Sequence, residues 1–362
     1  MGVTIRPGGI SFDCLLNNMM HSKEFKVNNF DLLRLIAATQ VIVDHYFQHL
    51  KLPISRFGID LLYLFPGVPV FFIISGYLIS ASYERNNNIK VYVRNRLLRI
   101  YPGLWVCIIV SAIVIHITGV RMFNKQVLAW LPAQFLGLIY TPSFLKDYGF
   151  GSYNGSLWTI PIELQFYALL PLCYFLFKKQ RFNVYLYCAL LVFVVANIVT
   201  QVVPINERLS KLISYTFIPH FYLFLLGVLM QRLQLYKSPV IYSRAVYWLI
   251  GYIAFSLSLS GVIEPVTYTL IKNIILAFTI LALAYTAPTL SKKLLRSNDI
   301  SYGIYIYHGL ILTVAVQLKL ANNLNLLILV AASYLLAYLS WIGVEKPFLR
   351  RKSKTIHTLP KD

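Results

Sequence analysis

Long apolar stretches constrain this chain more than any other feature of its sequence. Several approach or exceed the ~18 uncharged residues that mark a membrane span. Only 13% of the 362 residues are charged, about half of the roughly 25% found in soluble proteins. The sequence therefore predicts an all-α fold, a polytopic helical bundle in a membrane, and excludes a soluble enzyme, a disordered chain and a collagen-like fibre. The apolar runs lie near 31–50, 60–83, 100–118, 127–140, 158–177, 184–201, 217–235, 241–260, 267–287, 301–320 and 325–344.

The distribution of basic residues fixes which runs cross. The net charge is +20, and lysine and arginine concentrate in the cytoplasmic loops of membrane proteins. If all basic clusters are cytoplasmic, an even number of crossings separates each from the next. Three runs lie between Arg99 and Lys178, so one of them does not cross. The weakest is 127–140, which Pro132 and Gly137 interrupt, and runs of 10–14 residues favour an interfacial or re-entrant position.

We therefore expect about ten transmembrane helices, both termini in the cytoplasm, and one short interfacial or re-entrant segment at 127–140. The predicted organisation is a cytoplasmic N-terminal segment (1–28), a membrane domain (29–348) and a basic cytoplasmic tail (349–362). This topology accounts for the positive charge, so no nucleic-acid partner is expected. The four cysteines lack metal-ligand spacing, and no metal site is predicted.

The first span carries ionisable residues that an apolar run should not contain. Arg34 and His45 are eleven residues apart, close to three helical turns, so they share one face. Asp44 precedes the histidine. Each ionisable group at mid-membrane costs ~2.5–3.5 kcal/mol on insertion scales. Such residues indicate a functional site, although Arg34 reaching the interface and His45 bonding a neighbouring helix would be a purely structural alternative.

A carboxylate is predicted at the depth of this histidine. Counted from the cytoplasmic end of the first span, His45 lies ~22 Å into a ~30 Å core. Counted inward from Gly155 at the outer side, Glu163 lies ~8–12 Å below the outer surface by the same rise. A carboxylate beside an imidazole is the pairing that a general base needs. A structural ion pair between two spans is the alternative.

The cytoplasmic mouth presents a different chemistry. Arg96 and Arg99 are three residues apart and project from one helical face, and arginine is well suited to bidentate phosphate contacts. Ordinary anchoring by positive charge is the alternative. Ser75 lies at mid to inner depth, where a small residue also serves close helix packing. His308 is placed about 10 Å in from the cytoplasm by helical rise.

Together these residues resemble the membrane-bound acyltransferase family 3. The resemblance runs from about Asn28 to Phe348, and the specificity comes from the order of six motifs. They are FDLLRLIAATQVIVDH, GVPVFFIISGYLIS, RNRLLRIYP, SLWTIPIELQFYALLP, SYGIYIYH and EKPF. One departure is Pro69, where many relatives have an aspartate after Gly-Val.

The resemblance implies transfer of an acyl group, usually acetyl, from cytoplasmic acetyl-CoA to a hydroxyl. The expected acceptor is a glycan or glycolipid, such as lipopolysaccharide O-antigen, on the outer side of the cell inner (plasma) membrane. Acetyl-CoA is a co-substrate, no cofactor is bound permanently, and the lipid bilayer is a further partner. A transporter or flippase that uses the same buried charges is the rival function. The acceptor sugar, the acyl chain length and the oligomeric state stay open.

The expected roles follow from this combination. His45 acts as general base, although an acyl-histidine intermediate is also open. The catalytic group comprises His45, Glu163 and Asp44. The expected donor-binding residues are Arg34, Arg96, Arg99, Ser75 and His308, and the expected acceptor-side or supporting residues are Trp158, Tyr167 and Ser301.

Overall fold

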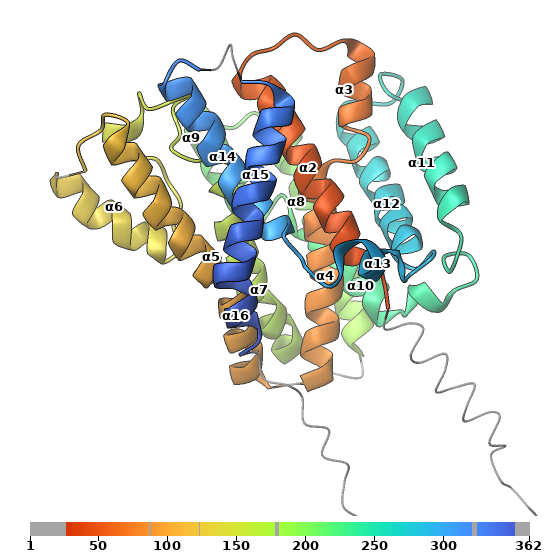
Figure 1. Cartoon of the computed structure of the whole chain (residues 1–362). Coiled ribbons are helices and arrows are strands. Elements are labelled where there is room, and N and C mark those ends of the chain that lie inside the picture. The colour runs from red at the N-terminus through yellow and green to blue at the C-terminus, as the bar shows by residue number, and fades with distance from the viewer. Residues whose placement is uncertain (1–26, 87, 123, 178–180, 321–323, 352–362) are drawn as a thin grey trace, which may run out of the picture.

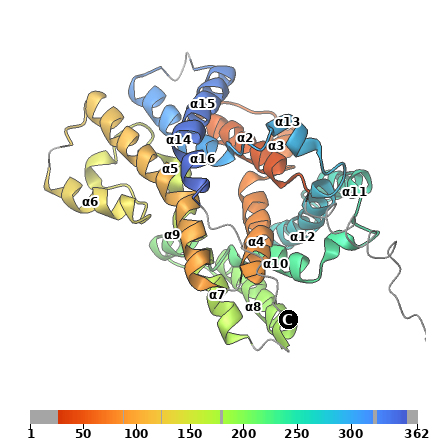
Figure 2. The ribbon, with the colours of Figure 1, turned by 60° about the horizontal axis from the view of Figure 1, so that its bottom comes forward.

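The computed structural model describes residues 27–86, 88–122, 124–177, 181–320 and 324–351. Within these ranges the regular secondary structure is helical, and most of the long helices run side by side as a bundle (Figure 1). The short helix α6 flanks the bundle on one side, and α11 with α12 flanks it on the other (Figures 1 and 2). The predicted N-terminal segment, apart from its last two residues, and the tail beyond residue 351 lie outside the described residues.

Each of the ten expected spans corresponds to a helix. Six helical segments, Arg56–Arg85, Ile89–Ile117, Gly155–Leu176, Phe182–Val202, Pro265–Ala284 and Leu326–Leu349, are long and apolar enough to cross a membrane, and α10 and α11 are shorter apolar helices. The chain is therefore a polytopic helical membrane protein. The ten helices are α2 (Phe30–His49), α4 (Gly67–Asn86), α5 (Ile89–Ile117), α7 (Thr159–Leu176), α8 (Phe182–Val202), α10 (Phe221–Arg232), α11 (Ala245–Ser258), α12 (Pro265–Ala284), α14 (Ser301–Gln317) and α15 (Leu326–Ser340).

The ends of α4 and α10 and the start of α5, all of which carry basic residues, lie at one end of the bundle, which we call the basic end. Glu84 near the end of α4 forms an ion pair with Arg232, the last residue of α10. The backbone N–H of Asn29, before α2, donates to the carbonyl of Ala284 at the end of α12 (2.9 Å). The start of α5 and the short α16 (Lys346–Leu349) lie at this same end in Figure 1. This arrangement requires the even number of crossings that the charge pattern predicted.

Helices α4 and α10 approach until their backbones touch. A Cβ atom added to Gly76 would lie 2.0 Å from the carbonyl oxygen of Phe224, and one added to Gly227 would lie 2.1 Å from that of Ile73. Only glycine permits this crossing, as small residues generally do at membrane helix interfaces. The contact holds the face of α4 that carries Ser75 in a fixed position.

The segment 127–140 forms α6 (Lys125–Phe135) and the turn that follows it. Its eleven residues span roughly 16 Å at 1.5 Å per residue, about half of a ~30 Å hydrocarbon core. The chain after it enters the bundle before α7 begins. The amide of Asn154 donates to the carbonyl of Ile306 in α14 (2.8 Å), and Asn154 is 2% exposed.

Lys146 is exposed, in the stretch between α6 and α7, and provides a test of the topology. In a background without the native cysteines, we expect Lys146→Cys to react with a membrane-impermeant thiol reagent added outside intact cells. Lys90→Cys, which is exposed at the basic end, should react only after the membrane is opened. Labelling of Lys146→Cys from the cytoplasmic side alone would contradict the ten-span topology.

Candidate active site

One carboxylate gathers two of the expected arginines. Arg34 of α2 forms an ion pair with Oδ2 of Asp299 (3.2 Å), and Arg99 of α5 forms an ion pair with the same oxygen. The other oxygen, Oδ1, accepts a hydrogen bond from the backbone N–H of Ser301, the first residue of α14 (3.2 Å). The side chains of Asp299, Arg34 and Arg99 are only 11%, 16% and 10% exposed. We call this arrangement the Asp299 clamp.

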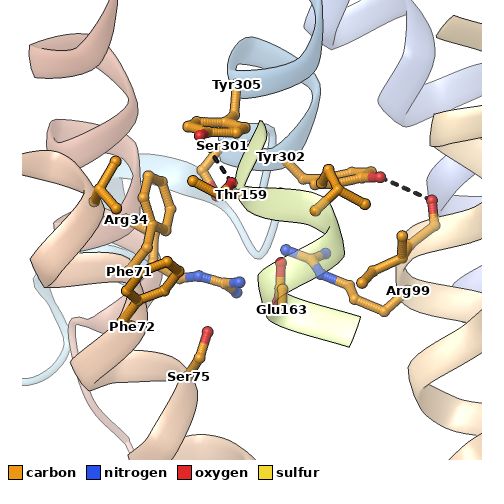
Figure 3. A pocket seen from close by; sticks show the side chains of 13 residues that line it. Arg34, Phe71, Phe72, Ser75, Arg99, Thr159, Glu163, Ser301, Tyr302 and Tyr305 are labelled. Carbon is orange, nitrogen blue, oxygen red and sulfur yellow. Dashed lines mark hydrogen bonds between the residues drawn. The ribbon is translucent and has the colours of Figure 1, made fainter. Parts of the chain in front are cut away.

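The clamp borders a cavity between α2, α4, α5, α7 and α14. Arg34 and Arg99 extend into it from opposite sides, and Glu163 and Ser75 lie nearby (Figure 3). At the end of the cavity away from the basic end, the wall is aromatic and includes Tyr305, so we call it the Tyr305 wall. The Thr159 hydroxyl there donates to the Tyr305 hydroxyl (2.8 Å). The lining residues are Arg34, Val68, Phe71, Phe72, Ser75, Arg99, Ile100, Thr159, Ile160, Glu163, Ser301, Tyr302 and Tyr305.

A second hollow extends from the clamp toward Arg96. It shares Arg34, Ser75 and Arg99 with the cavity and adds Asp31, Leu78, Ile79, Arg96, Tyr167 and Asp299. The Arg96 guanidinium lies 5.7 Å from the centroid of the Tyr167 ring, and in the described part of the chain no carboxylate forms an ion pair with it. The Nε atoms of Arg34 and Arg96 are buried without a hydrogen-bond partner. Unused guanidinium donors suit an anion such as a phosphate.

The two histidines meet on the far side of the Tyr305 wall. Nδ1 of His45 lies 2.9 Å from Nε2 of His308, and the His308 ring lies 5.9 Å from the Tyr305 ring. His308 is completely buried, whereas His45 is half-buried. The His49 ring, one turn after His45, stacks on Phe150 at 4.0 Å.

The expected contact between His45 and Glu163 is corrected by this geometry. Among the described residues His45 bonds to His308, and the Glu163 carboxylate accepts a hydrogen bond from the Tyr167 hydroxyl instead. The depth estimate failed because Gly155 is not at the outer surface: η2 (Gly155–Trp158) already packs against α14. Glu163 therefore lies closer to the basic end than expected, where it lines the same cavity as Arg34 and Arg99.

The position expected for His308 is also corrected. It was placed near the cytoplasmic mouth because its depth was counted from the start of its own helix. That start, at Ser301, adjoins Asp299 and lies at the level of Arg34, which is already inside the bundle. His308 is nine residues after Asp299, and His45 is eleven residues after Arg34. Because Asp299 and Arg34 lie at the same level, helical rise places the two histidines at a similar level.

Other expected residues are distributed between the two ends. Tyr167 and Ser301, assigned to the acceptor side, lie at the arginine end of the cavity, because α7 descends and α14 begins there. Trp158 lies beside the rings of Tyr215 and His220. Asp44 forms no hydrogen bond with the His45 or His308 ring in the described structure. Its carboxylate accepts hydrogen bonds from Gln48 (2.9 Å) and from Tyr63 (2.8 Å), which directly follows α3 (Arg56–Leu62).

Sequence reasoning missed two buried carboxylates. Asp299 precedes α14 by two positions, and an acidic residue just before a helix is typical of a capping position, so a local signal existed. Glu345 of the EKPF motif is 2% exposed and accepts a hydrogen bond from the Ser340 hydroxyl (3.1 Å). It lies in the π-helical turn η6 (Trp341–Glu345), a distortion that often marks functional sites.

Comparison with known proteins identifies the family of this chain. The sequence model of acyltransferase family 3, described as "Acyltransferase domain", matches residues 27–344. The chain belongs to this family. It is 30% identical to nodulation protein 10 of Rhizobium leguminosarum bv. viciae, over 91% of this chain and 95% of that protein. No solved structure matches it significantly.

Two further family relatives carry names that specify a reaction. The O-acetyl transferase of Shigella phage Sf6 is 26% identical over 91% of this chain and 98% of its own length. The peptidoglycan O-acetyltransferase OatA of Listeria monocytogenes is also 26% identical, over 89% of this chain and 55% of that longer protein. The chain is thus a multi-pass membrane acyltransferase.

The Asp299 clamp makes a prediction about stability. Asp299→Asn leaves two largely buried guanidinium groups without their ion-pair partner, and breaking such a buried pair costs ~3–5 kcal/mol of the free energy of unfolding. The matched control is Glu84→Gln, which breaks the more exposed pair with Arg232 and should cost ~0–1 kcal/mol. Unfolding of the detergent-purified variants measures both. Equal losses in the two variants would contradict a structural role for the clamp.

Proposed function

We propose that this protein is an O-acetyltransferase that moves an acetyl group from cytoplasmic acetyl-CoA to a hydroxyl of a cell-surface glycan or glycolipid. The observation that carries the proposal is the cavity itself. An arginine cluster stands at its basic end, and an imidazole pair lies beyond its other end. Arg34 and His45 are separated by eleven residues of one helix, about 16 Å of rise. A long donor molecule is needed to connect two such sites.

The arginine end suits coenzyme A. Its diphosphate and 3′-phosphate are multiply charged, and paired guanidiniums bind them through charge-assisted hydrogen bonds. Arg96 has no carboxylate partner among the described residues, and Arg34 and Arg99 share the single carboxylate of Asp299. The clamp itself therefore carries one net positive charge, and the Nε atoms of Arg34 and Arg96 keep unused hydrogen-bond donors for the phosphates. In this proposal Ser75 and Glu163 line the path of the pantetheine arm.

The histidine end suits the transfer step. The imidazole of His45 takes the proton of the acceptor hydroxyl while the hydroxyl oxygen attacks the thioester carbonyl carbon. The new C–O bond forms, the C–S bond breaks, and coenzyme A leaves as a thiolate. The proton held by His45 passes to the thiolate, so the products are the acetyl ester and free coenzyme A.

The acceptor end lies opposite the basic end. If the basic end is cytoplasmic, His45 faces the outer half of the membrane, where glycans are displayed. The names of the phage and Listeria relatives support O-acetylation, and the second supports a glycan acceptor. We accordingly propose an inner-membrane location and a surface polysaccharide, such as lipopolysaccharide O-antigen, as substrate. In this proposal Asp44, which precedes His45 on α2, and Trp158 support the acceptor side.

A test of the reaction separates it from the rival transport function. Purified protein in nanodiscs should transfer acetyl from acetyl-CoA to a glycan acceptor, or hydrolyse acetyl-CoA slowly without one. We expect His45→Ala to lower transfer by ~10²–10⁴-fold, the usual contribution of a general base. Mass spectrometry of the acceptor should show the mass of one acetyl group. Near-normal transfer by a folded His45→Ala protein would contradict the assignment of the base.

Arg96→Lys tests the donor site. The substitution keeps the positive charge but removes the planar guanidinium group, and it leaves the Asp299 clamp intact. We expect acetyl-CoA binding to weaken by ~1–3 kcal/mol, the value of a hydrogen bond to a charged group. Arg94→Lys is the matched control, since Arg94 is exposed on the same helix. Titration of acetyl-CoA against both variants measures the difference. Equal affinities would favour a purely anchoring role for Arg96.

A further inference from the structure

The two histidines form a hydrogen-bond relay whose direction is fixed at one end by the backbone. Nδ1 of His308 lies 3.1 Å from the carbonyl oxygen of Ile304, one turn earlier in α14. A carbonyl oxygen only accepts, so this bond requires a hydrogen on Nδ1 of His308. In a neutral imidazole the other nitrogen then carries a lone pair. Nε2 of His308 is consequently an acceptor, and it faces His45 at 2.9 Å.

The surroundings of His308 favour this neutral ring over a cation. The side chain is 0% exposed, and no carboxylate forms an ion pair with it within the described ranges. An unpaired charge in such a place is costly. The His308 ring also lies beside the Tyr305 ring, at 5.9 Å between ring centroids. A Cβ on Gly309 would lie 2.3 Å from the Asn154 side chain, so α14 has little freedom to turn here.

From this geometry we propose that His308 is a positioning residue that sets the tautomer of His45. The lone pair on Nε2 of His308 accepts the hydrogen of Nδ1 of His45, which leaves Nε2 of His45 unprotonated. No described residue forms a hydrogen bond with that Nε2 atom, and the ring is half-buried rather than sealed. The proposal rests on the proposed function in one respect: it supplies the atom, Nε2, that removes the acceptor's proton.

The same relay stabilises the intermediate state of the base. When Nε2 of His45 takes the proton, the ring becomes a cation and its Nδ1–H still points at the lone pair of His308. The base is thus oriented by a third group, as in other base-activated catalytic sites. Here that group is a neutral imidazole held by a backbone carbonyl, because the carboxylate expected for this role, Glu163, bonds to Tyr167.

The tautomer is measurable without any activity assay. In protein labelled with ¹⁵N-histidine and held in nanodiscs, solid-state NMR distinguishes protonated from unprotonated ring nitrogens, and His45→Gln identifies the His45 signals by their loss. We expect the parent to show His45 with a protonated Nδ1 and a bare Nε2. In His308→Phe, which keeps a buried ring but cannot accept, the His45 signals should shift toward the Nε2-protonated form. His116→Phe, on an exposed position of α5, is the control and should leave them unchanged.

Kinetics then separate positioning from donor binding. His308→Phe should lower the transfer rate by ~10–100-fold, as loss of an orienting partner does, with the KM for acetyl-CoA unchanged. His308→Gln, whose side-chain oxygen reaches the position of Nε2 and accepts, should recover part of the rate and restore the parent tautomer. A parent His45 protonated at Nε2, or a His308→Gln variant no faster than His308→Phe, would overturn the proposal. Full activity of His45→Ala would overturn the general-base function instead, whatever the tautomer.

Discussion

The shared carboxylate of Asp299 is the interaction on which the rest of the site depends. It binds two guanidiniums at once, so it joins α2, α5 and the start of α14, three segments that are far apart in sequence. Burying charge is costly unless it is paired, and the clamp limits that cost by placing one anion between two cations. The pairing remains incomplete by one charge. An anion also fits the buried Nε donors of Arg34 and Arg96, which no described residue uses.

Periodicity in the sequence was sufficient to predict what lies along one helix. The eleven-residue spacing put Arg34 and His45 on one face of α2, and the structure brings both toward α14. The spans and the short segment 127–140 were also predictable, since they depend on local composition and charge. Pairings between helices were not. Asp299 is 265 residues from Arg34, and nothing in a single sequence indicates that two such distant positions are in contact.

Depth was the quantity that the sequence predicted least well, because helical rise measures distance only from the start of the same helix. The chain before α7 enters the bundle and hydrogen-bonds through Asn154 to the α14 backbone. Because of that burial, α7 begins inside the bundle and not at its surface, and Glu163 lies closer to the arginines than expected. Likewise α14 begins beside Asp299 rather than at the membrane surface, so His308 lies deeper than expected, at the level of His45. Both errors have one origin, the assumption that every span begins at an interface.

Two reference points of the site lie close together along the chain. Asp299 precedes the first residue of α14 by two positions, and His308 lies about two turns after that residue. Because a helix rises by a fixed 1.5 Å per residue, the number of residues, and not a flexible loop, sets the distance between the arginine end of the cavity and the imidazole pair. That count can change only in whole residues. Inserting one residue between them would lengthen the interval by only 1.5 Å but turn His308 by about 100° around the axis, away from α2. An insertion in the loops at either end would leave this interval unchanged.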